Sequence, residues 1–190
     1  MIKRCEWANQ ESMREYHDTE WGVPVHDDRK LFEFIILGGA QAGLSWNTIL
    51  KRRKGYQKAF KDFNPLEVAA FGEADIESLM QNSDIIRNRL KIKSAISGAK
   101  AFLEIQKKYG SFNTYIWSFV KGKPKVNKIK NMKGIPIFTN EAEKMSKSLK
   151  KSGFNFVGPT ICYAFMQAVG MVNDHELGCF RWSEVQNITI

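Results

Sequence analysis

The sequence contains little cysteine, with only 3 in 190 residues. A small and odd number of cysteines argues against a disulfide framework and favours metal-binding or free-thiol roles. Long apolar runs are also missing: residues 32–37 could form part of a core helix but are far too few to cross a membrane. The N-terminal residues carry no apolar segment of the kind found in signal peptides. We therefore expect a cytoplasmic protein without a membrane anchor.

Acidic residues are under-represented relative to basic ones, with 20 Asp and Glu against 29 Lys and Arg, which gives a formal net charge of +9. Such a balance favours a polyanionic partner, either nucleic acid or an anionic membrane surface. A basic surface with no partner is the alternative, and charge alone leaves the two about even. A membrane-surface role is disfavoured because no predicted helix combines a basic face with large exposed apolar residues.

Alternating strand patterns, internal repeats and low-complexity tracts are all missing, and most of the chain shows helical periodicity. One predicted helix spans residues 44–60, with Ile49, Tyr56 and Phe60 facing inward. A longer one spans residues 89–107. Residues 121–136 show no clean period and predict a long exposed loop. The fold class is therefore mainly α, and the length suits a single domain over residues 1–190.

Residues 139–170 predict a helix, a tight glycine-bearing turn and a second helix. Thr139 or Asn140 can cap the first helix, Gly153 can end it, and Pro159 suits the first turn of the next. Backbone N–H groups at the start of the second helix are suited to a phosphate oxygen, a contact that positions DNA without reading bases. An ordinary helical hairpin with a solvated lysine face is the alternative. The residues we expect to contact DNA here are Phe156, Val157, Gly158, Thr160 and Lys147.

Two half-sites for a metal ion lie at opposite ends of the chain: Cys5 with His17, and His175 with Cys179. Together they form a Cys2His2 set, which is typical of closed, structural zinc sites. His175 and Cys179 are four residues apart, so a helical turn would place both on one face. Taken singly, each residue could equally be a buried cysteine or a hydrogen-bonded core histidine. We assign the third cysteine, Cys162, to the core.

Several specific runs, in order along nearly the whole chain, resemble the 3-methyladenine DNA glycosylase I family of bacterial repair enzymes in the helix-hairpin-helix superfamily. The matching runs are YHDTEWGVP at 16–24, QAGLSW at 41–46, WSFV at 117–120, GFNFVG at 153–158 and VNDH at 172–175. The resemblance implies a two-lobed helical fold, with the hairpin in one lobe and the termini joined in the other around one Zn²⁺ held by Cys5, His17, His175 and Cys179. It also implies an enzyme that flips an alkylated base out of duplex DNA and hydrolyses its N-glycosidic bond.

By the same resemblance, Tyr16, Trp21 and Trp46 line the pocket for the flipped base, and Trp7 lies nearby. Core packing is the alternative role for each of these aromatic residues. Gly43 and Leu44 match the tip that enters the gap left by the base, where an apolar side chain replaces the lost stacking. A buried leucine at a helix start is the alternative there.

One position departs from the family pattern: Gly38 stands where a pocket glutamate is expected. The acceptor for the exocyclic amine of the base and a favourable negative charge would both be lost. Either the pocket accepts another alkylated base, or excision is weak and the chain is a zinc-stabilised DNA-binding homologue. Asp174 is a candidate catalytic carboxylate, although a role beside the metal ligand His175 fits equally well. We expect a monofunctional, monomeric enzyme that acts on double-stranded DNA containing alkylated bases, since no lysine is marked as a Schiff-base nucleophile.

Overall fold

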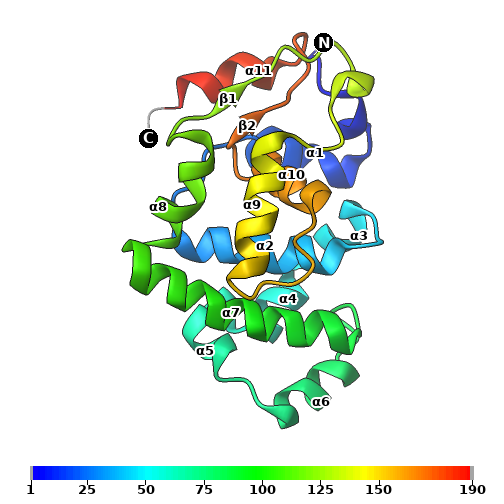
Figure 1. Ribbon diagram of the computed structural model, residues 1–190. Helices are drawn as coiled ribbons and strands as arrows, with labels where there is room; N and C mark the ends of the chain where they lie inside the picture. Colours follow the sequence, from blue (N-terminus) through cyan, green and yellow to red (C-terminus); the bar gives the residue numbers. More distant parts are fainter. Residues whose placement is uncertain (1, 189–190) are drawn as a thin grey trace.

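Helices make up almost all of the regular structure in the computed structural model, which describes residues 2–188 (Figure 1). Residues 1, 189 and 190 of the predicted domain lie outside the described part. The α-helices are α1 (Glu11–Thr19), α2 (Asp28–Gln41), α3 (Trp46–Leu50), α4 (Arg53–Ala59), α5 (Pro65–Ala69), α6 (Glu73–Gln81), α7 (Arg89–Tyr109), α8 (Phe112–Trp117), α9 (Asn140–Lys151), α10 (Pro159–Ala168) and α11 (Phe180–Glu184). The short 3₁₀ segments are η1 (Glu6–Asn9), η2 (Lys61–Phe63), η3 (Ser118–Val120), η4 (Met132–Gly134) and η5 (Val185–Asn187). The expectation of a mainly α fold is confirmed.

Helix α2 lies at the centre of the molecule, packed against α7 on one side and α10 on the other. Its Phe32 ring meets Phe102 of α7 with 5.0 Å between centroids, and Phe102 in turn stacks on Phe112 at 4.1 Å. Asp28, in the first turn of α2, accepts hydrogen bonds from the backbone N–H groups of Phe112 and Asn113 at 2.8 and 2.7 Å, which fixes the start of α8. These contacts join α2 to α7 and to the start of α8.

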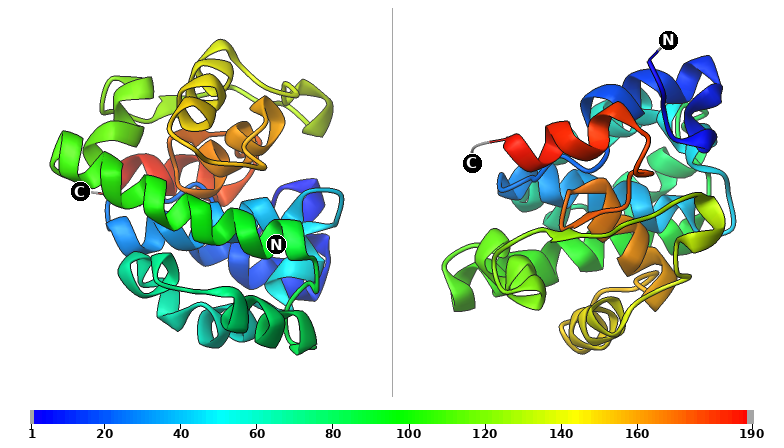
Figure 2. Two further views of the ribbon diagram at one scale, coloured as in Figure 1. Left: turned by 60° about the horizontal axis from the view of Figure 1, so that its bottom comes forward. Right: turned by 90° about the horizontal axis from the view of Figure 1, so that it is seen from above.

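The N-terminal segment at residues 3–6 lies beside the stretch at residues 176–180 that leads into α11 (Figures 1 and 2). The N–H of Phe180, at the start of α11, donates to the carbonyl of Lys3 at 3.0 Å. The N–H of Glu6 donates to the Glu176 carboxylate at 3.2 Å. Segments more than 160 residues apart in the sequence are therefore neighbours, and the two predicted metal half-sites are brought together.

The single helix predicted over residues 44–60 is wrong, because the structure has two helices, α3 and α4, in that stretch. Ser45 caps α3 by accepting from the N–H of Thr48 at 3.2 Å, and Arg52 has non-helical backbone angles (φ −104°, ψ 2°) that separate the helices. The inward-facing assignment survives the break, since Ile49, Tyr56 and Phe60 are all buried.

The exposed loop predicted over residues 121–136 also needs correction. Residues Lys125–Val126 form strand β1, which pairs in parallel with β2 (Val172–Asn173). A further bridge joins Ile129 to Glu176, and the Ile129 side chain is buried. A two-residue strand is too short to show an alternating pattern, so this pairing could not be predicted from the sequence. As a result the segment lies against the stretch that carries His175.

The helix bounds around the predicted hairpin agree with the sequence. Thr139 caps α9 by accepting from the N–H of Ala142 at 3.4 Å, and Gly153 beyond its end has φ +103°. The second helix, α10, begins at Pro159 directly after Gly158. Ala142, Met145 and Leu149 form the buried face of α9.

Within residues 2–188, no helix is both long enough and apolar enough to cross a membrane.

Candidate functional site

A cavity of about 450 Å³ opens among α1, α2, the start of α3 and α10. The four aromatic residues expected at the pocket all line it: Trp7, Tyr16, Trp21 and Trp46. Apolar side chains from the facing elements complete the wall, namely Met13, Phe34, Met132, Ile135, Ile161, Ala164, Phe165 and Ala168. The arrangement is suited to a flat, apolar or cationic ring, because aromatic faces stack on such rings and attract positive charge.

The aromatic rings form a continuous series rather than isolated contacts. Trp7 lies edge-on to Trp21 with 4.9 Å between centroids, and 6.4 Å from Tyr16, which is 5.6 Å from Trp46. Burial raises the pKa of the Tyr16 phenol, so this residue stays neutral and can act as a hydrogen-bond donor. The buried indole N–H of Trp46 has no hydrogen-bond partner among the described residues.

Gly38 lies in the wall of this cavity, on α2. A Cβ atom built on it would meet only Cγ2 of Ile161, at 3.8 Å, which is ordinary van der Waals contact. A Cβ atom is therefore accommodated at this position without a clash. Within residues 2–188, none of the cavity-lining residues carries a carboxylate.

Two amide side chains, Gln41 and Gln167, supply polar groups to the cavity wall, and neither was predicted as a site residue. The Gln167 Nε2 atom donates to Oδ2 of Asp174 at 2.8 Å. Asp174 itself is 1% exposed and does not line the cavity. Helical spacing could have indicated Gln167, because Ala164 and Gln167 are three residues apart on α10 and share a face.

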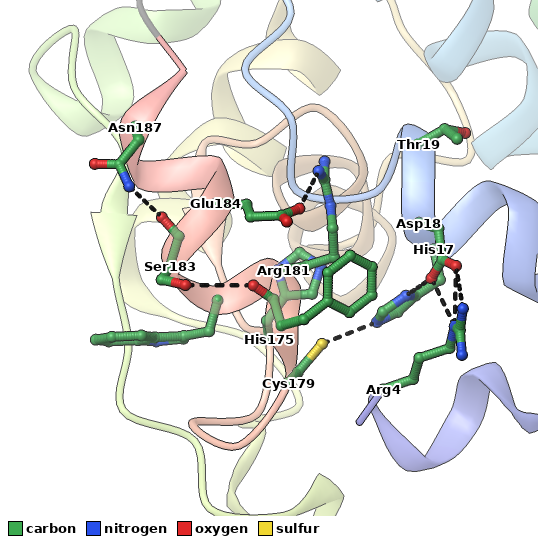
Figure 3. A network of polar contacts seen from close by, with 12 residues as sticks. Arg4, His17, Asp18, Thr19, His175, Cys179, Arg181, Ser183, Glu184 and Asn187 are labelled. Atoms are coloured by element: carbon green, nitrogen blue, oxygen red, sulfur yellow. Dashed lines mark hydrogen bonds and ion pairs between the residues drawn. The ribbon is translucent and has the colours of Figure 1, made fainter. Parts of the chain in front are cut away.

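Beside the cavity, three of the four predicted ligands form a buried cluster. The ligand atoms of Cys5, His17 and Cys179 all lie within 4.8 Å of one another. His17 Nε2 is 3.4 Å from Sγ of Cys179 (Figure 3). The N–H of Glu176 donates to Sγ of Cys5 at 3.4 Å, a contact that favours a thiolate.

The His17 ring is held in the tautomer that a metal ligand requires. Its Nδ1 atom is 2.7 Å from Oδ1 of Asp18, which leaves Nε2 facing the sulfur of Cys179 (Figure 3). Arg4 donates to both Asp18 oxygens, and its guanidinium holds the pKa of that carboxyl below its usual range. A carboxylate that orients a ligand histidine in this way is a common feature of zinc sites.

His175, the fourth predicted ligand, lies next to this cluster, but its ring nitrogens are not within 4.8 Å of all three other ligand atoms. Its ring centroid is 5.2 Å from that of His17, and its buried Nε2 has no hydrogen-bond partner among the described residues. The Nδ1 atom is 3.0 Å from Oδ1 of Asn173. Burial, with help from His17 and Arg181, lowers the pKa of His175 to about 3, so the ring is neutral at pH 7. An unpaired, neutral ring nitrogen at this place fits a metal ligand.

The helical turn expected between His175 and Cys179 is wrong. The two residues flank a turn at residues 177–178, and Cys179 precedes the first residue of α11. The backbone at Gly22 comes so close to His175 that a Cβ atom there would lie 2.6 Å from Cε1 of the ring. Gly22 also has φ +78°, so only glycine fits this turn without strain.

The pKa values of the two cluster cysteines shift in opposite directions. A hydrogen bond from Cys5, aided by His17, lowers the pKa of Cys179 to about 4, although burial opposes the shift. The same contact and burial raise the pKa of Cys5. A cysteine pair with one low pKa, beside the rings of His17 and His175, has the donor chemistry of a tetrahedral zinc site. The residues present therefore fit a zinc ion.

The predicted tip at Gly43 and Leu44 projects beyond the end of α2. Gly43 has φ +77° with open space around it, and the Leu44 side chain is 40% exposed. The Lys91 ammonium donates to the carbonyls of Ala40 and Ala42, each at 2.7 Å. This lysine thus holds the backbone from which the tip extends, a role that the sequence did not reveal.

The turn between α9 and α10 is held by its own hydrogen bonds. The Ser146 hydroxyl donates to the Val157 carbonyl at 2.6 Å, and Phe156 adopts a left-handed conformation with φ +54°. Thr160 is exposed in the first turn of α10. Lys147, on α9, is exposed and paired with Glu143 at 2.8 Å. The role of these residues in DNA binding stays a prediction.

The fold is that of helical 3-methyladenine glycosylases. It matches a crystal structure of a 3-methyladenine DNA glycosylase I with a TM-score of 0.91 and 50% identity, covering 94% of this chain and 98% of the other. The Staphylococcus aureus enzyme, whose structure describes 3-methyladenine recognition, gives the same TM-score at 36% identity, covering 94% and 96% of the two chains. The DNA-3-methyladenine glycosylase 1 of Escherichia coli (strain K12) is 49% identical over 179 residues, which is 94% of this chain and 96% of the relative.

A model of the methyladenine glycosylase family matches residues 7–182. The chain belongs to the methyladenine glycosylase family.

Proposed function

We propose that this protein is a DNA glycosylase that hydrolyses the N-glycosidic bond of 3-methyladenine and related alkylated purines in DNA, as the first step of base-excision repair. The observation that carries the proposal is the cavity of about 450 Å³ walled by Trp7, Tyr16, Trp21 and Trp46. Relatives that share nearly the whole chain are 3-methyladenine DNA glycosylases. The aromatic walls give the cavity the chemistry that such a base requires.

The reaction needs little acid catalysis. A purine methylated at N3 is cationic in the nucleotide, so the base is a good leaving group, and water takes its place on the sugar carbon. Stacking on the aromatic walls contributes about 1–3 kcal/mol per base, and cation–π attraction about 0.5–2 kcal/mol. The cavity thus selects a cationic, planar base and holds it away from the DNA stack. Because the proposal involves no lysine nucleophile, strand cleavage is not expected.

The base must leave the duplex to enter the cavity, and the tip at Gly43 and Leu44 is placed to assist. Leu44 is exposed and can fill the gap between neighbouring bases. The glycine before it keeps the backbone at the tip slender. We propose that Lys91, which holds Ala40 and Ala42, keeps this tip from folding back.

The start of α10 is the proposed phosphate contact of a helix-hairpin-helix motif. Pro159 has no N–H, so the free donors of the first turn belong to Gly158, Thr160 and Ile161. The positive left-handed angle at Phe156 turns the chain into this helix. Lys147 adds a screened attraction that should weaken as salt rises.

The proposed role of Zn²⁺ is structural. Cys5, His17, His175 and Cys179 would hold the ion, and a set of four protein ligands leaves no position for a substrate water. The ion would join the two ends of the chain and so stabilise the fold. The resemblance to the family implies a two-lobed fold in which this junction lies in one lobe and the hairpin in the other. We infer the same division for this protein.

The second candidate function is carried by Gly38. We propose that the family glutamate is replaced here by a glycine that leaves the cavity without a carboxylate. The base then loses one acceptor and one favourable charge. In this second function, excision is weaker or is directed at bulkier alkylated bases. At the extreme there is no excision, and the chain is a zinc-stabilised DNA-binding protein. In either case we expect a monomer acting on double-stranded DNA in the bacterial cytoplasm.

One experiment separates these two functions. The protein is incubated with duplex DNA treated with a methylating agent, and released bases are identified by mass spectrometry, beside a Gly38→Glu variant. We expect the natural protein to release 3-methyladenine. Normal DNA binding without any released base would reject the enzyme, and release by Gly38→Glu alone would assign the loss to that position.

A further inference from the structure

We propose that Gln167 is a specificity-determining residue, whose side-chain oxygen accepts a hydrogen bond from the exocyclic amine of an adenine in the cavity, and that Asp174 is the positioning residue that orients it. This inference rests on the proposed function and deepens it, because it names the feature of the base that this wall recognises. It also assigns Asp174 a role outside the reaction itself.

The orientation of the Gln167 amide follows from its partner. Its Nε2 atom lies 2.8 Å from Oδ2 of Asp174. A carboxylate can only accept, so the amide must present its NH₂ group there. The amide oxygen is then left on the other branch of a half-buried side chain that lines the cavity. The cavity therefore gains a fixed acceptor in a wall that has no carboxylate.

Asp174 is well suited to hold that amide and poorly placed to react. It is 1% exposed and also accepts from the Tyr163 hydroxyl and from Nδ2 of Asn127, both at 2.6 Å. Three donors on one buried carboxylate fix its position. The carbonyl of Gln167 accepts from the N–H of Gly22 at 3.1 Å, so the backbone of this residue is anchored as well. Both ends of Gln167 are thus held before a base arrives.

A fixed acceptor distinguishes the two purines. Adenine carries an amino group at position 6, which donates, whereas guanine carries a carbonyl oxygen there, which accepts. An acceptor facing an acceptor leaves two polar groups unpaired in a largely apolar cavity, which disfavours guanine. We therefore expect this wall to favour 3-methyladenine over 3-methylguanine by roughly 10-fold or more, the equivalent of one hydrogen bond.

Gln41 is the competing amide in the same cavity. Among the described residues its side chain has no hydrogen-bond partner, so it is free to turn either its oxygen or its NH₂ toward a base. A freely turning amide pairs with both purines and discriminates weakly. Gln167 differs from Gln41 in that its hydrogen bond to Asp174 fixes the orientation of the amide.

The test uses free bases, so it does not depend on catalysis. The intact protein is titrated with 3-methyladenine and with 3-methylguanine, and binding is followed by quenching of the cavity tryptophans. Gln167→Met should reduce the preference for 3-methyladenine roughly 10-fold, mainly by weakening adenine binding. Asp174→Leu should do the same by releasing the amide. Asp174→Asn should rescue the preference, because its oxygen can accept from Gln167 in the same place while the Asn127 amide turns over.

Two variants control for loss of structure. Tyr163→Phe removes one donor from Asp174 but leaves the contact to Gln167, so it should lower the melting temperature and keep the preference. Gln41→Met tests the competing amide. An unchanged preference in Gln167→Met, or a loss in Gln41→Met alone, would overturn the inference.

The same variants, measured for base release from methylated DNA, separate this inference from the proposed function. Release by the natural protein with a preference that Gln167→Met does not change rejects the role of Gln167 and keeps the enzyme. Selective, Gln167-dependent binding of 3-methyladenine without any release rejects the enzyme and keeps the role of Gln167.

Discussion

The ring of Trp21 stands edge-on to the ring of His175, with 4.5 Å between their centroids and 72° between their planes. Trp21 lines the cavity, while His175 belongs to the proposed metal site. Trp7 makes a second link, with its ring 5.1 Å from that of His17. The cavity and the proposed metal site therefore share a wall. We expect substitutions or metal loss at the metal site to alter base binding in the cavity.

Removal of the metal should loosen this shared wall. Treatment with a strong chelator, or the His175→Ala substitution, should lower the melting temperature by several degrees and weaken binding of 3-methyladenine, because Trp21 loses its support. Calorimetry and tryptophan fluorescence measure the two effects. Cys162→Ala is the matched control, since Cys162 is a buried cysteine outside the cluster and should leave the zinc content at one ion per chain. Equal zinc content in Cys179→Ala and the natural protein would contradict the ligand assignment.

Replacing Leu44 should affect DNA and leave the free base untouched. The side chain is 40% exposed, so Leu44→Ala should change the free energy of unfolding by less than about 0.5 kcal/mol. Binding to duplex DNA with a flipped base should weaken about 10-fold or more, because the gap in the stack is no longer filled. Leu66→Ala is the control, a leucine that is 67% exposed on α5 and should alter neither measurement. If Leu44→Ala bound lesion DNA with unchanged affinity, Leu44 would not be the side chain that fills the gap in the stack.

Lys91 should be as important to the tip as Leu44 itself. Burial lowers the pKa of its ammonium, and the hydrogen bonds to Ala40 and Ala42 satisfy two carbonyls at the end of α2. Lys91→Met should cost about 1–3 kcal/mol of stability and weaken binding to lesion DNA. Lys93→Met, which removes an exposed lysine two residues away, serves as the charge-matched control. Equal losses of DNA affinity in the two variants would mean that Lys91 acts only through its charge.

Arg53 forms a partly buried ion-pair network with Glu20 and Glu33, which predicts a pH dependence of stability. It donates to the Glu20 carboxylate at 2.6 and 2.7 Å and to Glu33 at 2.6 Å. Burial opposes ionisation of Glu20, but the Arg53 contacts outweigh it and lower the pKa of this carboxyl. A lowered folded-state pKa stabilises the protein above the unfolded value of about 4.3, and that stability is lost as the pH falls toward the folded value.

The Arg53→Met substitution should therefore cost about 2 kcal/mol at pH 7 and less near pH 3.5, where the natural protein has lost part of the same contribution. Urea unfolding at the two pH values measures the difference. A cost that stays constant, or grows, as the pH falls would mean that the network does not stabilise the fold through the charge of Glu20.

The sequence was sufficient for the helical class, the caps and the cavity aromatics, because each depends on local pattern or on specific runs. Thr139 and Pro159 mark helix starts through their own chemistry, and both stand where predicted. The turn between His175 and Cys179 was missed because a spacing of four residues is compatible with many backbone paths, and the pairing of Ile129 with Glu176 selects this one.

The polar side of the site was also hidden from the sequence. Helical spacing could have placed Gln167 in the cavity wall, but its orientation follows from its contact with Asp174, and the role of Lys91 follows from two carbonyls about 50 positions away in the chain. The Lys91 contacts depend on how α2 and α7 pack together, and the Asp174 contact depends on the path of the chain after α10, so no local pattern encodes them. Gly38 is the reverse case. The family resemblance singled out this position from the sequence, and the structure places it in the cavity wall without a side chain.

The central claim is that the aromatic cavity excises 3-methyladenine without a carboxylate at position 38. The most direct measurement is the single-turnover rate of base release from methylated duplex DNA, compared between the natural protein and Gly38→Glu under the same conditions. We predict measurable release of 3-methyladenine by the natural protein and faster release by Gly38→Glu, because a Cβ atom at this position meets no clash. Absence of release by the natural protein, with lesion DNA bound normally, would contradict it.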